Sequence, residues 1–510
     1  MKLTFVYTDL GWDNARKFNQ GVAQLSSCAR QAGHETSLIH IFEEISCEKY
    51  QELLDRHNPD LVAFSSISNL FPEVKKLASW TRGHLDVPIV YGGPHPTLAP
   101  QECMETGLFD IICRGEGDQA LVELCDALDK KEDVSNISNL WVKSNGQVHK
   151  NPIRPLIEDL DLLPPLDYEL FSYENLADAV AFKRLVLMAS RGCPYNCTYC
   201  CNHTFREMYP NKRKYVRFRS VDKVIDQISA GLQRYPSLER VRFFDDTLTI
   251  NKSWFREFAH KYKERIGLPY SANDRVNHMD EEIVSLLKES GCYFLEFGIE
   301  SGNARIREEV MRRGTPEKLI IYAFELCRKH GLRTSAFNII GVPGETFGTI
   351  MDTVRLNARA RPDLSYILYF HPFIGTKLHE VCRDNGYLTD KTFKTISEGP
   401  TLNLDTITET ETVFGFTFFR PLVRLYRFFY RLPSPISGFF DKTTAAMLSC
   451  RLFPQSTCVK LMPCFQKCHK YTQGFRRNAE ENIKKIPWLY GPLRCIYHFL
   501  FVPKRKRTES

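Results

Sequence analysis

The chain has 510 residues, several times the roughly 150 residues of a typical domain, so we expect more than one domain. Hydrophobic residues make up 43% of the sequence and charged residues 25%, which excludes wholesale disorder and fibrous repeats. No stretch approaches ~18 consecutive apolar residues, and Asp9 and Asp13 come too early for a signal peptide. We therefore expect a cytoplasmic protein whose 17 cysteines are free thiols or metal ligands rather than disulfides.

The net charge of +7 is unevenly distributed along the chain. Residues 413–510 contain 18 Lys and Arg against 4 Asp and Glu, a balance of +14, so the first 412 residues carry −7. The same segment holds 19 of the 62 aromatic residues. We therefore treat the C-terminal region as a separate unit.

Residues 1–140 predict an α/β domain with a doubly wound parallel sheet. Apolar strand-like runs at 3–7, 36–41, 61–65, 89–91 and 111–114 alternate with helical patterns at 20–32, 48–57, 72–84, 100–106 and 119–131. Strand–helix repeats of this length favour right-handed crossovers between parallel strands. Ligands of such sheets bind beyond the carboxyl ends of the strands.

Two glycine-containing loops follow strands of this predicted sheet. Gly92 and Gly93 come after the fourth strand, and Gly115 and Glu116 come after the fifth. Because glycine has no side chain, the backbone of such a loop can approach a bulky ligand closely. The alternative is that these glycines only permit tight turns.

A proline-rich linker, residues 141–180, should lie extended across the surface. In residues 181–395, strand-like runs recur at 185–189, 241–244, 270–273, 294–299, 335–340 and 366–370. Longer helical patterns separate them, for example at 221–234, 280–289 and 316–330. Six parallel strand–helix units predict a partial (β/α)6 barrel, whose chemistry lies at the carboxyl ends of its strands.

Three cysteines follow the first strand of the predicted barrel. Cys193, Cys197 and Cys200 have the spacing C-x3-C-x2-C on one short loop, which lets three thiolates point to one centre. Thiolates select iron–sulfur clusters or zinc. A structural zinc site needs a fourth ligand, for which Cys201 and His203 are poorly placed. Three ligands instead leave one iron of a 4Fe-4S cluster open; the alternative is three unrelated core cysteines.

This loop resembles the signature of the radical S-adenosylmethionine (SAM) superfamily, including the aromatic Tyr199 before the last cysteine. Segments 243–247, 298–302, 311–314 and 340–345 resemble later motifs of that superfamily, in the same order. The N-terminal sheet and the linker resemble the subfamily with a cobalamin-binding domain, which includes the anaerobic magnesium-protoporphyrin ester cyclase and several methylases. The resemblance covers roughly residues 1–390.

The resemblance implies that Cys193, Cys197 and Cys200 ligate three irons of a 4Fe-4S cluster. Residues implied to lie along SAM are Tyr199, Asp245, Asp246, Glu300, Ser301, Arg313 and Gly341. The aspartates would lie near the methionyl ammonium, Glu300 and Ser301 at the ribose, and Arg313 at the carboxylate. The alternatives are that the aspartates are strand-end caps, Glu300 a surface charge and Arg313 a solvated helix residue.

Cobalamin is the third cofactor that the resemblance implies. The residues expected along its corrin and nucleotide tail are Ser65, Ser66, Gly92, Gly93, Gly115 and Glu116. The sequence departs from the family in one motif, because the segment from Asp9 to Gly21 lacks the histidine of D-x-H-x-x-G. The lower face of cobalt would then be open or bound by water. The alternative is a sheet that acts as a lid without cobalamin.

Residues 396–510 form a basic, aromatic-rich region that we expect to be mainly helical. Arginines recur every three or four residues through the aromatic segment 414–430, which predicts an amphipathic helix with a cationic face on an anionic membrane. The alternative is a helical domain over the barrel mouth with solvated arginines. A nucleic-acid partner is not expected, because no recognisable module is present. Cys450, Cys458, Cys464 and Cys468, with His469, favour free thiols over a second cluster.

The predicted function is a radical SAM enzyme that modifies an unactivated carbon, most often by methylation. We expect a hydrophobic, lipid-like or natural-product substrate, an electron donor such as flavodoxin or ferredoxin, and peripheral contact with a membrane surface. Two alternatives remain: a radical SAM cyclase or oxidative rearrangement enzyme without methyl transfer, and a non-catalytic iron–sulfur protein at the membrane surface.

Overall fold

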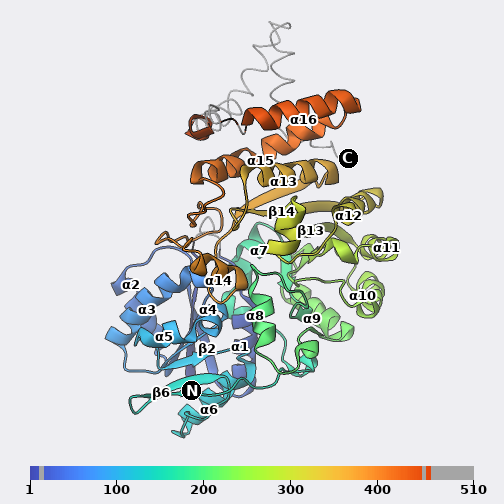
Figure 1. Ribbon diagram of the computed structural model, residues 1–510. Helices are drawn as coiled ribbons and strands as arrows, with labels where there is room; N and C mark the ends of the chain where they lie inside the picture. Colours follow the sequence, from blue (N-terminus) through green and yellow to red (C-terminus); the bar gives the residue numbers. More distant parts are fainter. Residues whose placement is uncertain (11–15, 449, 451–454, 461–510) are drawn as a thin grey trace, which may run out of the picture.

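The N-terminal unit is built on a seven-stranded sheet with the order β2-β1-β3-β4-β5-β6-β7. The computed structural model describes residues 1–10, 16–448, 450 and 455–460 (Figure 1). The strands are β1 (Lys2–Thr8), β2 (Glu35–Ile41), β3 (Leu61–Ser65), β4 (Ile89–Gly92), β5 (Ile111–Cys113), β6 (Leu140–Ser144) and β7 (Gln147–Lys150). The first five pair in parallel, which confirms the predicted doubly wound sheet.

Helices cover the faces of this sheet and bury its apolar side chains. They are α1 (Gln20–Gln31), α2 (Cys47–His57), η1 (Ser68–Leu70), α3 (Phe71–His84), α4 (Pro94–Leu98), α5 (Pro100–Glu105) and α6 (Asp118–Asp129). The side chain of Asn19 caps α1 by accepting a hydrogen bond from Val22 N at 2.9 Å. Because the sheet order reverses between β1 and β3, the loops at that point leave room for a ligand.

The sheet continues past residue 140, where the sequence suggested that a linker begins. β6 and β7 form an antiparallel hairpin, and β6 pairs with β5 at the edge of the sheet. The hairpin was not foreseen, because its strands are short and partly exposed.

The second half of the linker is buried, which corrects the expectation of an extended surface segment. Its elements are η2 (Leu160–Leu162), η3 (Glu169–Phe171), η4 (Tyr173–Asn175) and α7 (Ala177–Val180). The ring of Tyr168 stacks on Phe18 at 4.8 Å and meets Tyr173 edge-on at 5.0 Å. These aromatic rings belong to one hydrophobic cluster that includes side chains from both sheets. Aromatic burial therefore outweighs the preference of the prolines for an extended surface path.

The second unit contains a sheet of six parallel strands, which confirms the predicted partial barrel. Its order is β15-β14-β13-β12-β11-β8. The strands are β8 (Arg184–Leu187), β11 (Arg240–Phe243), β12 (Tyr270–Asp274), β13 (Cys292–Glu300), β14 (Arg333–Ile340) and β15 (Leu364–Tyr369). The helices between them are α9 (Val221–Arg234), α10 (Lys252–Arg265), η6 (Val276–His278), α11 (Glu281–Glu289), η7 (Ile306–Val310), α12 (Glu317–Lys329) and α13 (Phe347–Ala360).

A short insertion follows β8 and carries the three predicted cluster cysteines. It contains β9 (Ser190–Arg191), α8 (Cys201–Glu207), η5 (Lys212–Lys214) and β10 (Arg217–Phe218). β9 and β10 pair as a two-stranded antiparallel ladder. The cysteine loop between β9 and α8 is thus held at its first end by this ladder.

The helices α14 (Lys377–Asp384), α15 (Glu409–Phe429) and α16 (Ser434–Leu448) follow the six-stranded sheet, and residues 455–460 are helical as well. α15 packs on α13 and β15 and contributes Phe414, Phe419 and Tyr426 to a buried cluster. Arg420 donates to Ser365 O at 2.9 Å and Arg427 donates to Pro362 O at 2.7 Å. The helix is as predicted. These bonds tie one side of α15 to the start of β15. Arg420 is nevertheless exposed, so the membrane contact of this helix stays a prediction.

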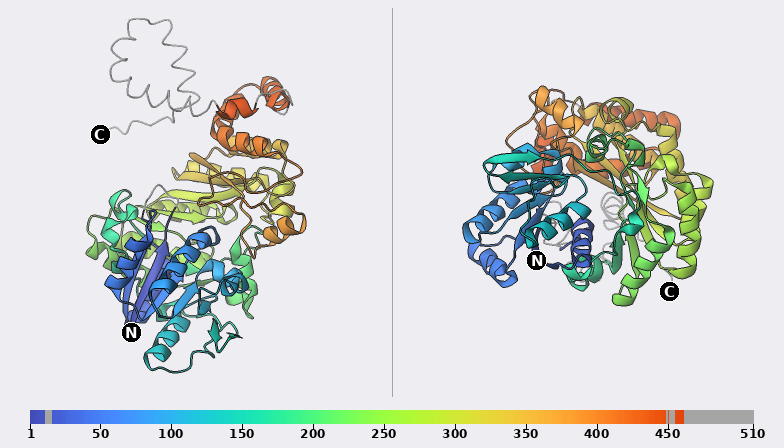
Figure 2. Two further views of the ribbon diagram at one scale, coloured as in Figure 1. Left: turned by 90° about the vertical axis from the view of Figure 1, so that its left-hand side faces the viewer. Right: turned by 90° about the horizontal axis from the view of Figure 1, so that it is seen from below.

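The N-terminal unit lies beside the six-stranded sheet, and α15 and α16 lie at the end of the molecule far from the N-terminus (Figures 1 and 2). In the described part of the chain, no helix is long and apolar enough to span a membrane. Cys464, Cys468, His469 and the basic C-terminal segment 488–510 lie outside the described residues. Cys450 and Cys458 are free thiols.

We predict that Phe171→Ala lowers the free energy of unfolding by about 3–5 kcal/mol, because Phe171 is 4% exposed and its removal leaves a cavity between the two units. Urea unfolding followed by tyrosine fluorescence measures the loss. Leu162→Ala is the matched control, since Leu162 is 75% exposed in the same linker. An equal loss of stability in the two variants would show that the aromatic cluster contributes nothing special to the free energy of unfolding.

Candidate active site

The start of the cysteine loop is tied to the end of β11 by Asp245. This carboxylate is fully buried and accepts hydrogen bonds from Ala189 N at 3.1 Å, from Ser190 N at 2.7 Å and from the Ser190 hydroxyl. Burial raises the pKa of Asp245 to about 6, against the opposing effect of these donors. The contacts match the strand-end cap that the sequence left open as an alternative.

The three cysteines differ in exposure and in their partners. Cys197 is buried, whereas Cys193 and Cys200 are half-buried. Two guanidinium groups approach Cys197 Sγ: Arg275 Nη1 at 3.5 Å and Arg313 Nη1 at 3.9 Å. Positive charges beside a sulfur compensate the negative charge of a thiolate ligand.

The donor set is that of a cluster with three protein ligands. Three thiols on one loop, with two buried arginines behind one of them, fit a soft, electron-rich metal centre. In the part of the chain that the structure describes, no three His, Cys, Asp or Glu side chains are already arranged around a common metal position. The fit therefore rests on the chemistry of the donors and on their common loop.

Arg313 connects the cysteine loop to the end of β13. Its guanidinium donates to Tyr199 Oη at 3.0 Å and to Gly298 O at 2.6 Å, and it lies 3.4 Å from a carboxylate oxygen of Glu300. A Cβ atom at position 298 would lie 2.1 Å from Glu300 Oε1, so only glycine leaves room for this ion pair. Four predicted site residues, Cys197, Tyr199, Glu300 and Arg313, are thus brought into one network.

The remaining residues predicted along SAM differ in their exposure and in their hydrogen-bond partners. Asp246 is exposed and accepts a hydrogen bond from Asn202, whose amide also approaches Cys200 Sγ at 3.8 Å. Ser301 is fully buried, and its hydroxyl accepts a hydrogen bond from Asn303 N. Gly341 N donates to the carboxylate of Glu345 at 2.6 Å. Asp246 therefore borders the cysteine loop, whereas the Ser301 hydroxyl is used within the fold.

A cavity of about 410 Å³ lies at the carboxyl ends of the N-terminal strands. Predicted cobalamin contacts that line it are Ser65, Gly92, Gly93, Gly115 and Glu116. Gly93 has a φ of 98°, and a Cβ there would lie 2.9 Å from Ser65 Oγ, so a side chain would clash at the cavity wall. Ser66 does not line the cavity, because it is buried and hydrogen-bonds to Tyr91 Oη at 2.7 Å.

The opposite wall of this cavity comes from the second unit, through Met188, Ser190 and Arg191. A smaller cavity of about 230 Å³ shares Gly93 and Arg191 with it and reaches Gly192 beside the first cluster cysteine. A large ligand held by the N-terminal loops would therefore face the start of the cysteine loop. This open, glycine-lined space between the two units fits a corrinoid with its nucleotide tail.

Two ion pairs, each with one buried partner, join the two units at the rim of these cavities. Arg191 binds Asp118 through two hydrogen bonds of 2.8 and 2.9 Å. Arg217 binds both carboxylate oxygens of Glu116, at 2.6 and 3.1 Å. Glu116 therefore serves the interface between the units, although it also borders the cavity.

Sequence reasoning missed Arg275, Arg191 and Asp118. Arg275 follows the end of β12, where barrel residues carry chemistry, so the position itself was a usable signal. Its guanidinium lies 3.6 Å above the ring of Tyr195 in the cysteine loop. Arg191 and Asp118 lie 73 residues apart, and no local pattern pairs them.

Comparison with known proteins agrees with this geometry. Residues 187–356 match the profile of the Radical SAM superfamily, and residues 18–125 match that of the B12 binding domain. An uncharacterized methyltransferase of Pyrococcus horikoshii is 32% identical over 373 residues, which cover 72% of this chain and 79% of that protein. The chain belongs to the radical SAM superfamily, in the branch with a B12-binding domain.

Two further relatives extend the comparison. The anaerobic magnesium-protoporphyrin IX monomethyl ester cyclase of Rubrivivax gelatinosus is 27% identical over 364 residues, 67% of this chain and 62% of the cyclase. The chain thus spans less than two thirds of that enzyme's length. The solved structure of the cobalamin-dependent SAM radical enzyme OxsB, with aqua-cobalamin and SAM bound, has a TM-score of 0.65 at 14% identity and covers 90% of this chain and 71% of that one. At this identity the similarity shows that the two proteins share a fold.

The family and its cofactors, a 4Fe-4S cluster, SAM and cobalamin, are confirmed by these matches. The protein is a radical SAM enzyme of the cobalamin-dependent, methylase-like branch. The hypothesis of a non-catalytic iron–sulfur scaffold is thereby wrong. The roles of individual residues at the three cofactors remain predictions.

We predict that Glu345→Gln changes the pH dependence of stability. Burial raises the pKa of Glu345 from an ordinary 4.5 to about 8, and one of its carboxyl oxygens has no hydrogen-bond partner within the described part of the chain. Between these two values the folded protein keeps a proton that the unfolded chain has lost, so this group's contribution to stability falls as pH rises to about 8. The variant, which keeps an acceptor for Gly341 N–H, should gain about 3–5 kcal/mol relative to wild type between pH 5 and pH 9.

Urea unfolding at pH 5, 7 and 9 measures this difference. Glu309→Gln is the control, because the same substitution there removes an exposed carboxylate. If the wild type and Glu345→Gln lose stability in parallel as the pH rises, the buried neutral carboxyl is excluded.

Proposed function

We propose that the enzyme transfers a methyl group to an unactivated carbon of a hydrophobic substrate. The observation that carries this proposal is the cavity between the two units, which is lined by the N-terminal loops and ends beside Gly192 at the cysteine loop. Bound there, cobalamin supplies a methyl group, while the cluster and SAM supply the radical chemistry that opens a C–H bond. Cobalamin on one side, and the cluster with SAM on the other, would then face the same carbon of the substrate.

The chain's own residues bind and orient these groups. Cys193, Cys197 and Cys200 would hold three irons, and the charges of Arg275 and Arg313 would balance the thiolate of Cys197. For SAM, Arg313 offers a guanidinium that Tyr199 and Glu300 already hold in place. Asp246 is an exposed carboxylate beside the loop and suits a positively charged amine. Binding energy at these groups fixes the geometry of the reactants.

A cyclase or oxidative rearrangement enzyme is the second candidate, favoured by the match to the magnesium-protoporphyrin ester cyclase. The two differ in products. Methyl transfer consumes a second SAM and yields S-adenosylhomocysteine together with 5′-deoxyadenosine. Reconstituted protein with flavodoxin or ferredoxin as electron donor should give both products in the presence of substrate; 5′-deoxyadenosine alone would favour the cyclase.

Cys197→Ala should abolish formation of 5′-deoxyadenosine, because two thiolates hold a cluster far less tightly than three. Liquid chromatography of the product and iron analysis of the purified variant measure the loss. Cys201→Ala is the matched control: it removes the neighbouring thiol outside the motif and should keep near wild-type turnover. A wild-type rate in Cys197→Ala would remove this residue from the ligand set.

We also propose that the enzyme docks on a membrane surface through α16, which gives access to a lipid-like substrate. Apolar side chains exposed on α16 are Ile436, Phe439, Phe440 and Met447, and Phe428 of α15 is exposed as well. Clusters of exposed large apolar residues mark interaction sites. Nearby Lys442 and Arg431 are also exposed and suit anionic headgroups. This surface adds to the arginines of α15 as the proposed membrane contact.

Phe439→Ser should lower the partition coefficient onto anionic vesicles by about tenfold, because Phe439 is 63% exposed and its insertion buries apolar area. Vesicle co-sedimentation at low and high salt measures binding. Val180→Ser is the control, since Val180 is 66% exposed in the linker. Equal partitioning of both variants and the wild type would leave α16 without a membrane role.

A further inference from the structure

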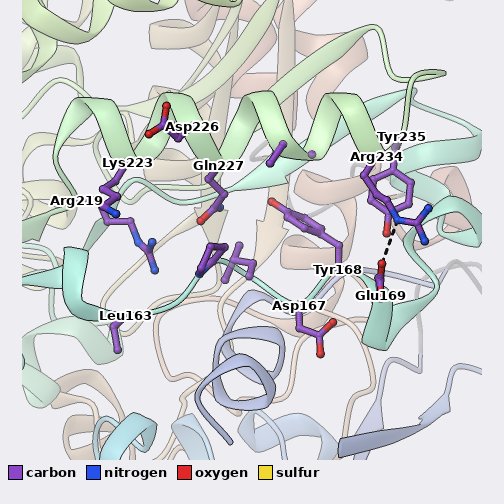
Figure 3. Close-up of a pocket in the computed structure, with 14 residues that line it drawn as sticks. Leu163, Asp167, Tyr168, Glu169, Arg219, Lys223, Asp226, Gln227, Arg234 and Tyr235 are labelled. Carbon is purple, nitrogen blue, oxygen red and sulfur yellow. Dashed lines mark hydrogen bonds and ion pairs between the residues drawn. The ribbon is translucent and has the colours of Figure 1, made fainter. Parts of the chain in front are cut away.

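A second groove, of about 440 Å³, runs between the linker and α9 (Figure 3). It shares no lining residue with the cofactor cavity. Residues of α9 reach it at 223, 226–227, 230–231 and 234, the spacing of one helical face, and Tyr235 follows directly after the helix. From Lys223 to Arg234 this face is about 16 Å long. The groove therefore suits an extended ligand rather than a compact one.

Positive charge gathers at one end of the groove. Arg219 is 8% exposed, and its Nη2 donates only to neutral oxygens: Gln24 Oε1 at 2.9 Å and Pro164 O at 3.1 Å. Lys223 lies one helical turn away along the wall and is exposed. In the described ranges, neither side chain forms an ion pair with a carboxylate. The carboxylates of Asp161 and Asp118 act on Arg219 only at longer range. A buried guanidinium that donates only to neutral oxygens can still accept an anionic ligand.

The other charged side chains of the groove are already paired. These pairs are Asp167 with Arg30 at 3.1 Å, Asp226 with Arg265 at 2.6 Å and Glu169 with Arg234 at 3.1 Å. The last pair is drawn in Figure 3 at the end of the groove away from Arg219. Arg30 and Arg265 come from outside the groove, whereas Arg234 lines it. Among the described residues, Arg219 and Lys223 therefore remain as the positive charges of the groove that form no ion pair.

Unpaired polar atoms and apolar walls complete the groove. Gln227 and Tyr235 are each 7% exposed, and Gln227 Oε1 and Tyr235 Oη have no hydrogen-bond partner among the residues that the structure describes. The side chain of Gln227 points from α9 toward the linker in Figure 3. Buried polar atoms in native proteins are nearly always satisfied by protein, water or ligand. Leu166, Pro165 and Ala230 provide an apolar surface beside them.

We propose that this groove binds a small anionic amphiphile, a carboxylate or phosphate head on an extended apolar body. The head pairs with Arg219 and Lys223, and the body lies along α9 over Leu166 and Ala230. Because the groove and the cofactor cavity are lined by different residues, the site is separate from the reaction site and does not depend on the reaction proposed above.

The groove communicates with the cofactor cavity through one side chain. Gln24 accepts the hydrogen bond of Arg219 with its Oε1 and lines the cavity beside Gly21 and Leu25. An anion that draws Arg219 toward the groove competes with this hydrogen bond. Occupancy of the groove should therefore change cobalamin affinity, and cobalamin should change ligand affinity by the same factor.

Decanoate is the probe, measured by calorimetry on the full-length protein loaded with cluster and cobalamin. Decanoate should bind, and decanol, which lacks the charge, should bind about tenfold more weakly or not at all. Ala230→Trp fills the groove from an exposed helix position and should abolish binding. Lys223→Ala should weaken binding several-fold. Decyl phosphate in place of decanoate distinguishes a phosphate head from a carboxylate.

The matched controls are Gln233→Trp, which places the same side chain on the solvent face of α9, and Lys263→Ala, which removes an exposed lysine of α10. Both should bind decanoate like the wild type. The proposal is overturned if neither decanoate nor decyl phosphate binds, if decanol binds equally well, or if Ala230→Trp binds normally. These measurements record binding and need no catalytic turnover. A negative result would therefore refute the groove without bearing on the proposed reaction.

The coupling between the groove and cobalamin binding is tested by a separate measurement. Cobalamin titrations with and without decanoate should differ by about threefold or more in the wild type and agree within error in Ala230→Trp. Identical cobalamin affinities in the wild type, with decanoate shown to bind, would refute the coupling.

Discussion

The ion pair between Arg191 and Asp118 sets the relation between the two halves of the molecule. It joins the residue just before the cysteine loop to the first residue of α6 in the N-terminal unit, with two hydrogen bonds and an almost fully buried carboxylate. A buried charge that loses its partner costs several kcal/mol, so the pair resists separation. Because Asp245 holds the adjacent Ser190, the loop is fixed from both units at once.

This constraint explains why the predicted cofactor residues face one another. The cavity of the N-terminal sheet can reach the cysteine loop only if the two units keep one orientation. The aromatic rings of the linker, with Phe18 and Tyr168 stacked, reinforce that orientation through apolar burial. The ion pairs fix the orientation of the two units, because they need a defined geometry. The aromatic cluster contributes most of the free energy that holds the units together, because it buries apolar area.

The same contacts show where reading the sequence failed. Prolines at 164 and 165 predicted a surface segment, but the apolar residues that follow are buried between the units. Arginines on α15 were predicted from their spacing, but their hydrogen bonds to carbonyls at the start of β15 could not be. In both cases a local pattern described the element and left its partners open, because burial and contacts depend on residues far away in the chain.

The sequence by itself determined the elements, the order of the two α/β units, the cysteine motif and the family, since hydrophobic periodicity and motif spacing are local properties. Of the predicted cobalamin contacts, five line the cavity, while Ser66 is turned into the core. Only the tertiary structure revealed Arg275 at Cys197, the pair of Arg191 with Asp118 and the groove along α9. Each depends on side chains tens of residues apart, whose approach is set by the packing of whole units. The place of Arg275 after a barrel strand marked it as a candidate, but its partner could not be read from the sequence.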